Sequence, residues 1–473
     1  MPKGPYLVVG LGRAGRAAAD ALVEAGRVRA WDHSRAPEVG AARDALLAAG
    51  VPVRLGGDGL DMLEGIRTVV KSPGIRPDTP VIAAARRRDL LVIDELELGW
   101  RLARSPIVAV TGTNGKSTVA ALLVAALSAA GRRPVLAGNT FFGPPLSAVP
   151  RDEHRTIVAE VSSYQAEASP TFLPRAAVFT NLTREHVHWH GTVAAYAAAK
   201  RRVFVRGDET VGTASINVDD RFGRDLAAAV RARGGSALAY GRSADADYRV
   251  GSVRSELRGA VVEIDAPDRA VTLRTRLPGV HNALNVAAAL ALADGLGLER
   301  ERTLEALEAA VAVPGRFEVV AANRSFDVVV DFAHTPDGVK QTLALARELA
   351  TARGGRVIAT LTSFGNNDRD TREQIGRAAR RGTDLLVLCA VSLRGEPGLV
   401  ALAALLAGAR SASGGLVECV LDRRAAIERA IGHARRGDLV MLLGRGSYTR
   451  LAHDRHGRAS HLDDREVAQS LLS

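Results

Sequence analysis

The sequence predicts an α/β protein of three domains. The chain has 473 residues, which is more than a single hydrophobic core usually contains. At about 100 to 200 residues per domain, this length predicts three domains. Short β-branched runs alternate with Ala/Leu-rich stretches along the chain, which is typical of parallel strands connected by helices. Breaks in this pattern near Ser105 and at Val313-Pro314-Gly315 predict domains at 1–104, 105–312 and 313–473.

The first domain opens with a predicted buried strand at 6–12, a helix at 13–25 and a strand at 27–32. Gly10, Gly12 and Gly15 form a Gly-x-Gly-x-x-Gly turn with Asp32 about 20 residues on, a pattern similar to a dinucleotide fingerprint. Any nucleotide phosphate can use such a turn, so the signal alone is weak. Further strands at 68–72 and 90–94 and a helix at 95–104 complete a Rossmann-like domain.

The second domain begins with a strand at 105–110 and a helix at 119–130, and the loop between them reads Gly-Thr-Asn-Gly-Lys-Ser-Thr. Glycines that turn backbone N–H groups inward, a helix N-terminus, a lysine and a serine are the parts of a triphosphate site with Mg²⁺. Lys116 is one of only five lysines in an arginine-rich chain, which favours a need for a compact ammonium there. We therefore predict a variant phosphate loop and a central domain similar to phosphate-loop ATPases.

The rest of the chain continues the alternation. Strands are predicted at 156–161 and 176–181, a helix at 193–205, β-rich sequence at 237–277, and helices at 283–295 and 302–311. In the third domain, strands at 327–330, 356–361, 384–389 and 438–443 alternate with helical segments, which predicts a second Rossmann-like parallel sheet.

Composition limits the possible partners. The net charge is +11, but basic residues are interleaved with acids and aromatics are only 4%, so we expect anionic small-molecule substrates and no nucleic acid. No apolar run reaches about 20 residues and the first residues lack a signal-peptide layout, so we expect a cytoplasmic protein without membrane insertion. Cys389 and Cys419 lie in apolar runs without metal-ligand spacing and are expected to be buried, reduced thiols.

Three further parts of the chain offer candidate metal ligands. Glu160 ends an apolar strand downstream of the loop, where a carboxylate can hold Mg²⁺. His186, His188 and His190 would share one face of an extended segment, as in a zinc site, but one His on a second Mg²⁺ fits a phosphate site better. Lys200 is another rare lysine, and a primary amine can take up CO₂ to become an anionic carbamate ligand.

Six motifs occur together in order. They are Thr-Gly-Thr-Asn-Gly-Lys-Ser-Thr, Glu-Val-Ser-Ser-Tyr-Gln, Asn-Leu-Thr-Arg-Glu-His, Tyr-Ala-Ala-Ala-Lys, His-Asn-Ala-Leu-Asn and Pro-Gly-Arg-Phe-Glu-Val. In order and spacing they resemble the Mur ligases, and the resemblance spans nearly the whole chain. It implies a three-domain, ATP-dependent amide ligase that builds the peptide of UDP-linked peptidoglycan precursors.

The resemblance implies a role for each matching position. Lys116, Glu160, His186 and Lys200 would be catalytic, and two Mg²⁺ ions would be held by Ser117, Glu160, His186 and carbamylated Lys200. ATP would be bound by Gly112, Thr113, Asn114, Gly115, Lys116, Ser117, Thr118, Asn282, Asn285, Arg316 and Asp331. The UDP-linked substrate would meet Gly12, Arg13, Ala14, Asp32, Ser72, Pro73, Gly74, Asn139 and Ser162.

The two ends of the chain resemble different branches of the family. The N-terminal domain resembles the glutamate-adding branch, which implies UDP-N-acetylmuramoyl-L-alanine as acceptor. That branch's Asp-Ser-Lys-Ala-Thr pattern would place a lysine near 333, whereas residues 331–337 read Asp-Phe-Ala-His-Thr-Pro-Asp. This stretch, with those at 367–370, 444–446 and 463–466, resembles the branch that adds the third residue through an L-configured amine, although residues 391–394 lack its Asp-Asn-Pro-Arg signature. The combination favours L-glutamate over D-glutamate.

Other hypotheses remain open. An NAD-dependent oxidoreductase would explain the first glycine turn but not the phosphate loop, Glu160, His186 and Lys200. A non-catalytic nucleotide-binding module would not need every metal ligand. A ligase for another peptide or a polyglutamate chain would share the ATP chemistry. We expect the ligase to be a monomer.

Overall fold

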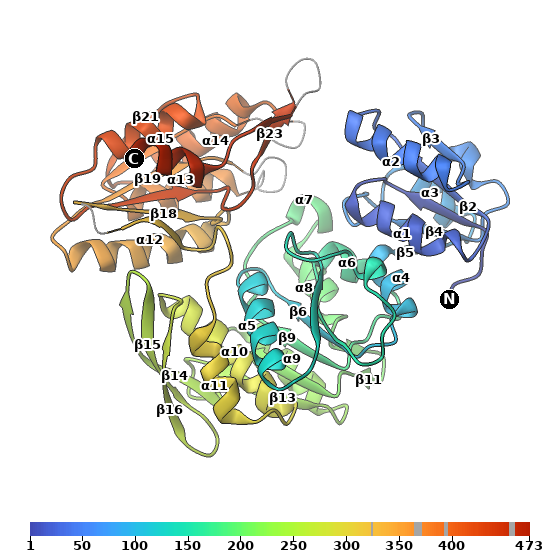
Figure 1. The fold of residues 1–473 in the computed structure, drawn as a ribbon, viewed down its shortest axis with the longest axis horizontal. Coiled ribbons are helices and arrows are strands. Elements are labelled where there is room, and N and C mark those ends of the chain that lie inside the picture. The colour runs from blue at the N-terminus through green and yellow to red at the C-terminus, as the bar shows by residue number, and fades with distance from the viewer. Residues whose placement is uncertain (323–324, 364–370, 392–395, 454–458) are drawn as a thin grey trace. The chain divides into compact units, whose positions relative to one another are not determined.

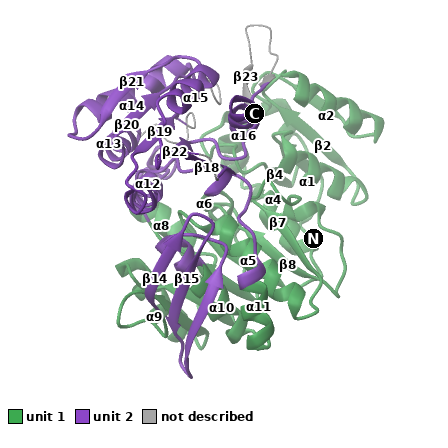
Figure 2. Ribbon diagram, turned by 60° about the vertical axis from the view of Figure 1, so that its left-hand side comes forward, with its two compact units in different colours: residues 1–182, 194–249, 286–307 green, residues 183–193, 250–285, 308–473 purple. Residues whose placement is uncertain are grey.

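The computed structural model describes the whole chain apart from residues 323–324, 364–370, 392–395 and 454–458. The motifs at 367–370 and most of 391–394 therefore lie outside the described residues. Three main sheets of five, nine and six strands follow one another along the chain (Figure 1), which confirms the predicted three-domain α/β class. Figure 2 shows two compact units, each described here by itself: 1–182, 194–249 and 286–307, and 183–193, 250–285 and 308–473.

The first sheet is entirely parallel, and apolar helices cover both of its faces. Its strand order reverses between β1 and β4, which is the place where open α/β sheets bind ligands. The predicted strand at 6–12 already ends at Val9, because Gly10 turns the chain with φ +88°. The strands in spatial order are β3 (Val53–Leu55), β2 (Val28–Asp32), β1 (Tyr6–Val9), β4 (Thr68–Lys71) and β5 (Leu91–Asp94), and the helices are α1 (Arg13–Val23), α2 (Pro37–Ala48), α3 (Pro80–Arg87) and α4 (Glu95–Leu102).

The second sheet has nine strands, and the printed pairings from β7 to β14 are parallel. The chain ends this sheet with an antiparallel hairpin of β15 and β16. In spatial order the strands are β16 (Ala270–Thr275), β15 (Gly259–Asp265), β14 (Tyr248–Glu256), β13 (Ser236–Gly241), β12 (Thr213–Asn217), β9 (Ala176–Phe179), β6 (Ile107–Thr111), β8 (Thr156–Glu160) and β7 (Pro134–Gly138).

Four of the seven α-helices of this region were predicted, with somewhat different ends, and three were not. The helix predicted at 193–205 ends at Arg201, and Val205–Arg206 instead forms strand β10 of a small hairpin with β11 (Glu209–Thr210). The helices are α5 (Lys116–Ala129), α6 (Ser163–Glu167), α7 (Val187–His190), α8 (Val193–Arg201), α9 (Arg221–Arg231), α10 (Val280–Gly295) and α11 (Arg300–Ala309).

The third sheet contains the four predicted strands as β18, β19, β20 and β22, all parallel. The predicted parallel arrangement of these four strands is confirmed, and a further strand that was not predicted, β17, pairs antiparallel with β18 at one edge. In spatial order the strands are β17 (Glu318–Ala321), β18 (Asp327–Asp331), β22 (Leu439–Leu443), β19 (Val357–Leu361), β20 (Leu385–Leu388) and β21 (Leu416–Cys419). The helices are α12 (Pro336–Thr351), α13 (Arg372–Gly382), α14 (Gly398–Arg410), α15 (Arg423–Gly432) and α16 (Asp464–Leu472). A hairpin of β23 (Arg450–His453) and β24 (Ala459–His461) precedes α16.

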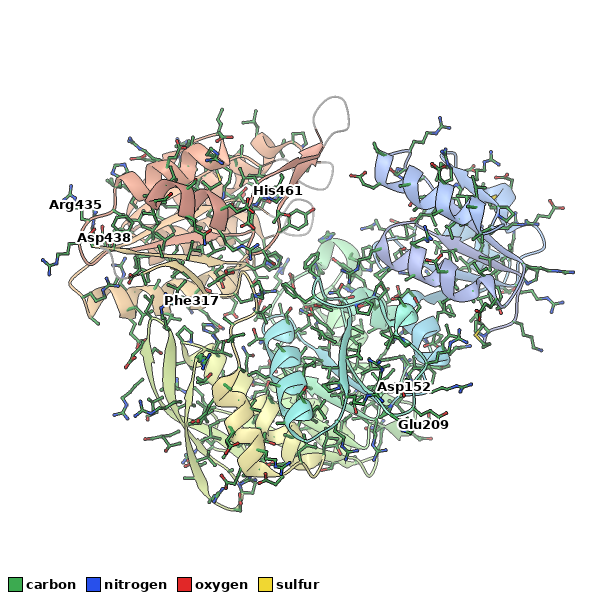
Figure 3. All side chains as sticks on the ribbon, viewed as in Figure 1. Asp152, Glu209, Phe317, Arg435, Asp438 and His461 are labelled. Carbon is green, nitrogen blue, oxygen red and sulfur yellow. The ribbon has the colours of Figure 1, made fainter. Side chains whose placement is uncertain are left out.

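Two details of the third sheet bear on the predictions. Cys389 is buried after β20, but Cys419 is exposed on the edge strand β21, so the expectation of two buried thiols was wrong for the second. At the opposite ends of the strands, Asp438 fixes the starts of β19 and β22 by accepting N–H bonds from Arg356 at 2.8 Å and Arg435 at 2.9 Å; Figure 3 marks Asp438 and Arg435.

Three buried carboxylates at the start of α4 connect the first two sheets within unit 1. Asp94 caps the helix by accepting the Leu96 N–H at 3.1 Å. The Glu95 carboxylate accepts the N–H of Ser147 at 2.6 Å, and Glu97 accepts the N–H of Thr171 at 3.1 Å. Each carboxylate is therefore satisfied by a donor, as burial requires.

No helix in the described part of the chain is both long enough and apolar enough to cross a bilayer.

The Glu95 carboxyl provides a test of this junction. Burial raises its pKa to about 7 from an ordinary 4.5. Folded protein therefore binds one more proton than unfolded protein between these pH values, and its stability falls as pH rises through that window. We expect Glu95→Gln to remove this loss, so that the variant gains up to about 3 kcal/mol relative to wild type between pH 4.5 and 8.

Thermal melting of both proteins across that pH range measures the difference. Glu97→Gln is the matched control, because Glu97 lies two residues further along α4 and is also buried. A constant difference in Tm between Glu95→Gln and wild type from pH 4.5 to 8 would contradict the interpretation.

Candidate functional site

The predicted phosphate loop lies between β6, which is fully buried, and α5. The helix begins at Lys116, three residues earlier than predicted, so the lysine and the serine form its first turn. Gly112 has φ +145°, and a Cβ there would lie 1.9 Å from the Thr180 Oγ1 atom. Gly115 has φ +86° and caps α5 without a side chain, which leaves the N-terminal N–H groups of the helix open. This backbone fits a bound phosphate.

A pair of oxygen atoms adjoins the first turn of α5. Strand β8 pairs in parallel with β6, and the register sets Glu160 beside Val110 at the same end of the sheet. The Ser117 hydroxyl donates to Glu160 Oε2 at 2.8 Å. A hydroxyl and a carboxylate are the ligands that Mg²⁺ prefers. The pair therefore suits a Mg²⁺ ion beside the phosphate loop.

Two of the rare lysines meet at one backbone carbonyl. The Lys116 ammonium donates to Gly112 O at 3.2 Å and to Thr113 O at 2.8 Å. The Lys200 ammonium donates to the same Gly112 O at 2.6 Å and lies 4.5 Å from the ring centroid of Tyr196. Lys200 is only 2% exposed, so it is not the solvated surface lysine that its helix position would allow.

The loop is also clamped by two residues that the sequence analysis missed. The Asn181 side chain accepts the N–H of Asn114 at 2.9 Å and donates to its carbonyl at 3.1 Å. The Thr180 hydroxyl donates to the same carbonyl at 2.6 Å. Both follow β9, the other neighbour of β6. Their position at the end of a predicted strand was the signal that could have identified them.

The Gly10–Gly15 turn and the Ser72–Gly74 turn meet at the strand reversal of the first sheet. Ser72 Oγ donates to Gly10 O at 2.9 Å. Asp32 supports the turn by accepting the N–H groups of Leu11 at 2.6 Å and Ser34 at 2.8 Å. The predicted residues of this group therefore come together: Gly12, Arg13, Ala14, Asp32, Ser72, Pro73 and Gly74.

Arg13 connects this group to the second sheet within unit 1. Its exposed guanidinium donates to Gly143 O at 2.6 Å and to the carbonyl of Thr140. Asn139, immediately before Thr140, donates its N–H to Glu160 O at 2.8 Å. Ser162 caps α6 in a capping box with Gln165. Asn139 and Ser162 thus flank the strand end that carries Glu160.

The remaining predicted ATP residues belong to unit 2. Asn282 and Asn285 lie one helical turn apart on α10, both buried, and Asn285 Nδ2 donates to Asn282 Oδ1 at 3.1 Å. Arg316 lies with its guanidinium carbon 4.5 Å from the centroid of the Phe332 ring. Asp331 accepts the N–H of Phe317, the next residue after Arg316, at 2.7 Å; Figure 3 marks Phe317. The structure therefore brings together each pair, Asn282 with Asn285 and Arg316 with Asp331.

The histidine segment is helical, not extended. His186 has φ +56° and precedes α7, so the alternation that would have placed three histidines on one face does not apply. His186 Nε2 lies 3.5 Å from one oxygen of Glu185, and His334 Nε2 lies 3.6 Å from the other. Glu185 and His334 were not among the predicted site residues.

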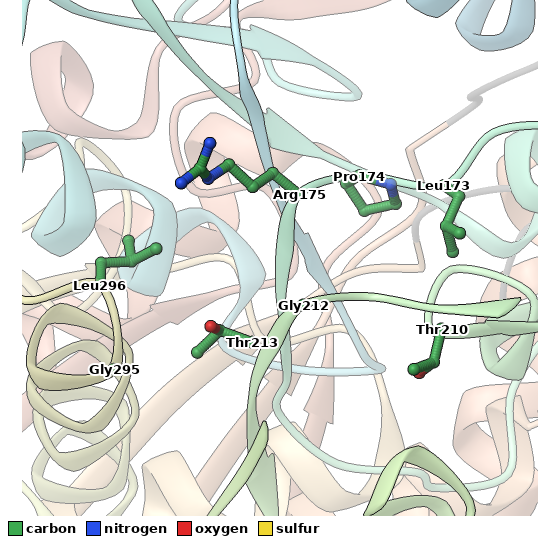
Figure 4. A pocket seen from close by; sticks show the side chains of 8 residues that line it. All are labelled: Leu173, Pro174, Arg175, Thr210, Gly212, Thr213, Gly295 and Leu296. Carbon is green, nitrogen blue, oxygen red and sulfur yellow. The ribbon is translucent and has the colours of Figure 1, made fainter. Parts of the chain in front are cut away.

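A cavity of about 490 Å³ lies elsewhere in unit 1. Its lining residues lie just before β9, around the start of β12 and at the end of α10, so the cavity lies at the amino ends of these strands, opposite to the phosphate loop. Figure 4 shows the lining side chains, which include only one charged residue, Arg175. This cavity is therefore separate from the candidate site.

Models of known families match three successive parts of the chain. Residues 5–94 match the N-terminal domain of MurD-like Mur ligases, residues 110–293 the Mur ligase middle domain, and residues 315–446 the glutamate ligase domain of Mur ligases. The chain belongs to the Mur ligase family. The suspected resemblance is thereby confirmed, including the MurD-like character of the first domain.

Two relatives show how this Mur ligase compares with others. A UDP-N-acetylmuramoyl-L-alanyl-D-glutamate–2,6-diaminopimelate ligase of Aquifex aeolicus is 32% identical over 404 residues, which cover 81% of each chain. A UDP-N-acetylmuramoylalanine–D-glutamate ligase of Pelotomaculum thermopropionicum is 34% identical over 455 residues, which cover 92% of this chain and 91% of that one. The relatives thus include enzymes that add different amino acids.

Solved structures support the fold. The UDP-N-acetylmuramate–alanine ligase MurC of Thermotoga maritima aligns over 99% of this chain and 98% of its own, with a TM-score of 0.63 and 19% identity. A folylpolyglutamate synthase of Mycobacterium tuberculosis aligns over 73% of this chain and 90% of its own, with a TM-score of 0.58 and 19% identity.

The Asn181 clamp generates a prediction for ATP binding. We expect Asn181→Ala to raise the KM for ATP about tenfold, because the loop loses two hydrogen bonds that fix its backbone before the phosphate arrives. Steady-state kinetics with varied ATP measures this. Asn217→Ala is the matched control: Asn217 is also an Asn at a strand end, buried where Asn181 is half-buried, but its side chain accepts a hydrogen bond within its own turn, from the Asp219 N–H. Equal effects of the two variants on the ATP KM would count against the clamp.

Proposed function

We propose that this Mur ligase joins glutamate to UDP-N-acetylmuramoyl-L-alanine, with formation of ADP and phosphate, and that the incoming isomer is L-glutamate. The observation that carries the ligase chemistry is the convergence of Lys116, Lys200 and the Ser117–Glu160 oxygen pair on one glycine loop. The MurD-like N-terminal domain supports the acceptor. So does the long alignment with a D-glutamate ligase, over 92% of the chain.

The third domain supports the isomer. Where a D-glutamate ligase would have its lysine, this chain has Ala333, between Asp331 and His334. Ala333 is buried and donates its N–H to Asp331 Oδ1 at 2.8 Å. The sequence of this turn resembles ligases that accept an L-configured amine. An acceptor site that resembles the glutamate-adding branch, joined to a third domain that resembles the branch with an L-configured amine, favours L-glutamate.

A role is proposed for each group of the predicted site residues. Lys116 with the loop from Gly112 to Thr118 binds the phosphates of ATP, Asn282 and Asn285 bind adenine, and Arg316 and Asp331 contact ATP from the third domain. Gly12, Arg13, Ala14, Asp32, Ser72, Pro73, Gly74, Asn139 and Ser162 serve the UDP-linked acceptor.

In the proposed reaction, the acceptor carboxylate attacks the γ-phosphorus of ATP, and the bond to the β,γ-bridging oxygen breaks to release ADP. The resulting acyl phosphate is attacked by the amine of glutamate, which forms the amide and releases phosphate and a proton. Lys116 and the N–H groups of the loop neutralise the negative charge that accumulates on the phosphoryl oxygens.

Two Mg²⁺ ions are part of the proposal. Ser117 and Glu160 would hold one, and His186 and a carbamate on Lys200 would hold the second. Bound Mg²⁺ would lower the repulsion between ATP and the attacking carboxylate. A carbamate keeps one N–H on Nζ, so Lys200 could still donate to Gly112 O as it does in the structure. We further propose domain boundaries after residues 104 and 312, action as a monomer, and a cytoplasmic location where ATP and UDP-linked precursors are available.

Phosphate release with different amino acids tests the proposal. With UDP-N-acetylmuramoyl-L-alanine and ATP, we expect L-Glu to stimulate release most, above D-Glu, L-Lys and diaminopimelate, because the third domain lacks both the D-glutamate lysine and the diamino-acid signature. Stimulation by D-Glu alone would correct the isomer. Stimulation by none of the four, or only with a polyglutamate acceptor, would reject the assignment to peptidoglycan precursors.

Lys200 allows a separate test of the carbamate. We expect Lys200→Ala to lose activity at least a hundredfold and to regain part of it with a short carboxylic acid, which can replace the carbamate as an oxygen ligand. Lys340→Ala is the matched control, because Lys340 is an exposed lysine on α12. Full activity of Lys200→Ala without additive would refute the role.

A further inference from the structure

Lys71 is a buried lysine that none of the roles above uses. It is the last residue of β4 and is only 1% exposed. Its ammonium lies 3.0 Å from Asp94 Oδ2 and makes two longer contacts of 3.4 Å with the carbonyls of Ser72 and Pro73. An ammonium has three N–H donors, and these three oxygens match them. The lysine therefore ties the turn after β4 to the end of the neighbouring strand β5.

The contact with Pro73 fixes the direction of the next peptide group. In a trans peptide the C=O and N–H point in opposite directions. Because the Pro73 carbonyl faces the buried ammonium, the N–H of Gly74 faces away from it, and Gly74 is exposed. In the described part of the chain this N–H has no hydrogen-bond acceptor. The turn thus presents a free backbone donor beside the strand reversal between β1 and β4.

The glycines near the strand reversal differ in the reason why a side chain is absent. A Cβ at Gly15 would lie 1.6 Å from Gly10 O, so the packing of α1 on the turn requires that glycine. A Cβ at Gly12 or at Gly74 would meet nothing within 4 Å. The fold alone does not require glycine at these two exposed positions, whereas close approach of a ligand to the backbone would. Gly12 also caps α1, an 11-residue helix, without a side chain, so the N–H groups of that helix end are open as well.

We propose that Lys71 is a positioning residue that holds the Ser72–Pro73–Gly74 turn so that the Gly74 N–H binds a phosphate oxygen of the UDP-linked acceptor. The proposal rests on the proposed function, because it takes the acceptor as the ligand of this crevice. Lys71 itself touches no substrate. Its ammonium acts only through the two carbonyls that it draws inward.

Asp94 makes the arrangement stable. Burial raises the pKa of its carboxyl above the ordinary value, and the Lys71 ammonium opposes this shift. Removal of the lysine alone would leave a buried carboxylate without its cation, which is strongly destabilising. The double variant Lys71→Met/Asp94→Asn removes both charges together, and its Asn can still cap α4.

The test measures binding of UDP-N-acetylmuramoyl-L-alanine by calorimetry, and the KM values for acceptor and ATP, in wild type, Lys71→Met, the double variant and Lys340→Met. We expect both Lys71 variants to weaken acceptor binding and raise the acceptor KM at least tenfold, with the ATP KM and kcat within about twofold of wild type. Lys340→Met should behave as wild type. A merely structural role would lower the amount of active enzyme without this split.

Two results would overturn the inference, and they are distinguishable. If wild type binds the acceptor and the folded double variant binds it equally well, Lys71 does not position the turn and the proposed function stands. If wild type binds neither the acceptor nor UDP, the proposed function fails and the inference falls with it.

Discussion

The carbonyl of Gly112 is the point on which the candidate ATP site depends. It accepts hydrogen bonds from Lys116 and Lys200, and the glycine itself lies so close to Thr180 that no side chain fits. A backbone carbonyl with two ammonium donors stays in one orientation, and the loop N–H groups are then preset toward a phosphate. The same contact draws Lys200 from a helix 84 residues along the chain from Lys116. Loop shape and the position of the proposed carbamate are therefore set by one atom.

The parallel topology explains why the other groups come together as they do. Val110 pairs with Glu160 on one neighbouring strand and with Val178 on the other, so the residues that follow each strand meet at one edge of the sheet. The first sheet repeats this arrangement at its strand reversal, where the turns after β1 and β4 are joined by the Ser72–Gly10 hydrogen bond. In both places the candidate binding groups belong to short turns that follow buried strands.

The sequence alone identified the residues whose chemical role can be inferred from residue type and local motif. The glycine loop, Glu160 at a strand end and Lys200 as a rare amine were all predicted, and the fold class was confirmed. It did not reach the residues that act through geometry, such as Asn181, whose amide pairs with loop backbone, or Glu185, whose two oxygens face two histidines far apart in the chain. It also missed the edge strand β17 and misjudged Cys419, because which strand forms the edge of a sheet is a property of topology and not of local pattern.

The five lysines of the chain differ in burial and in their contacts. Lys3 and Lys340 are exposed, whereas Lys71 and Lys200 are buried and Lys116 is half-buried in the loop. At each of these three positions the ammonium donates to backbone carbonyls of a turn. A guanidinium is planar and larger, and unlike an ammonium it cannot donate in three directions from one nitrogen atom. In a chain that uses arginine almost everywhere else, lysine is thus retained where a compact cation shapes a backbone turn. This constraint links the ATP loop and the proposed acceptor turn, although they lie on different sheets.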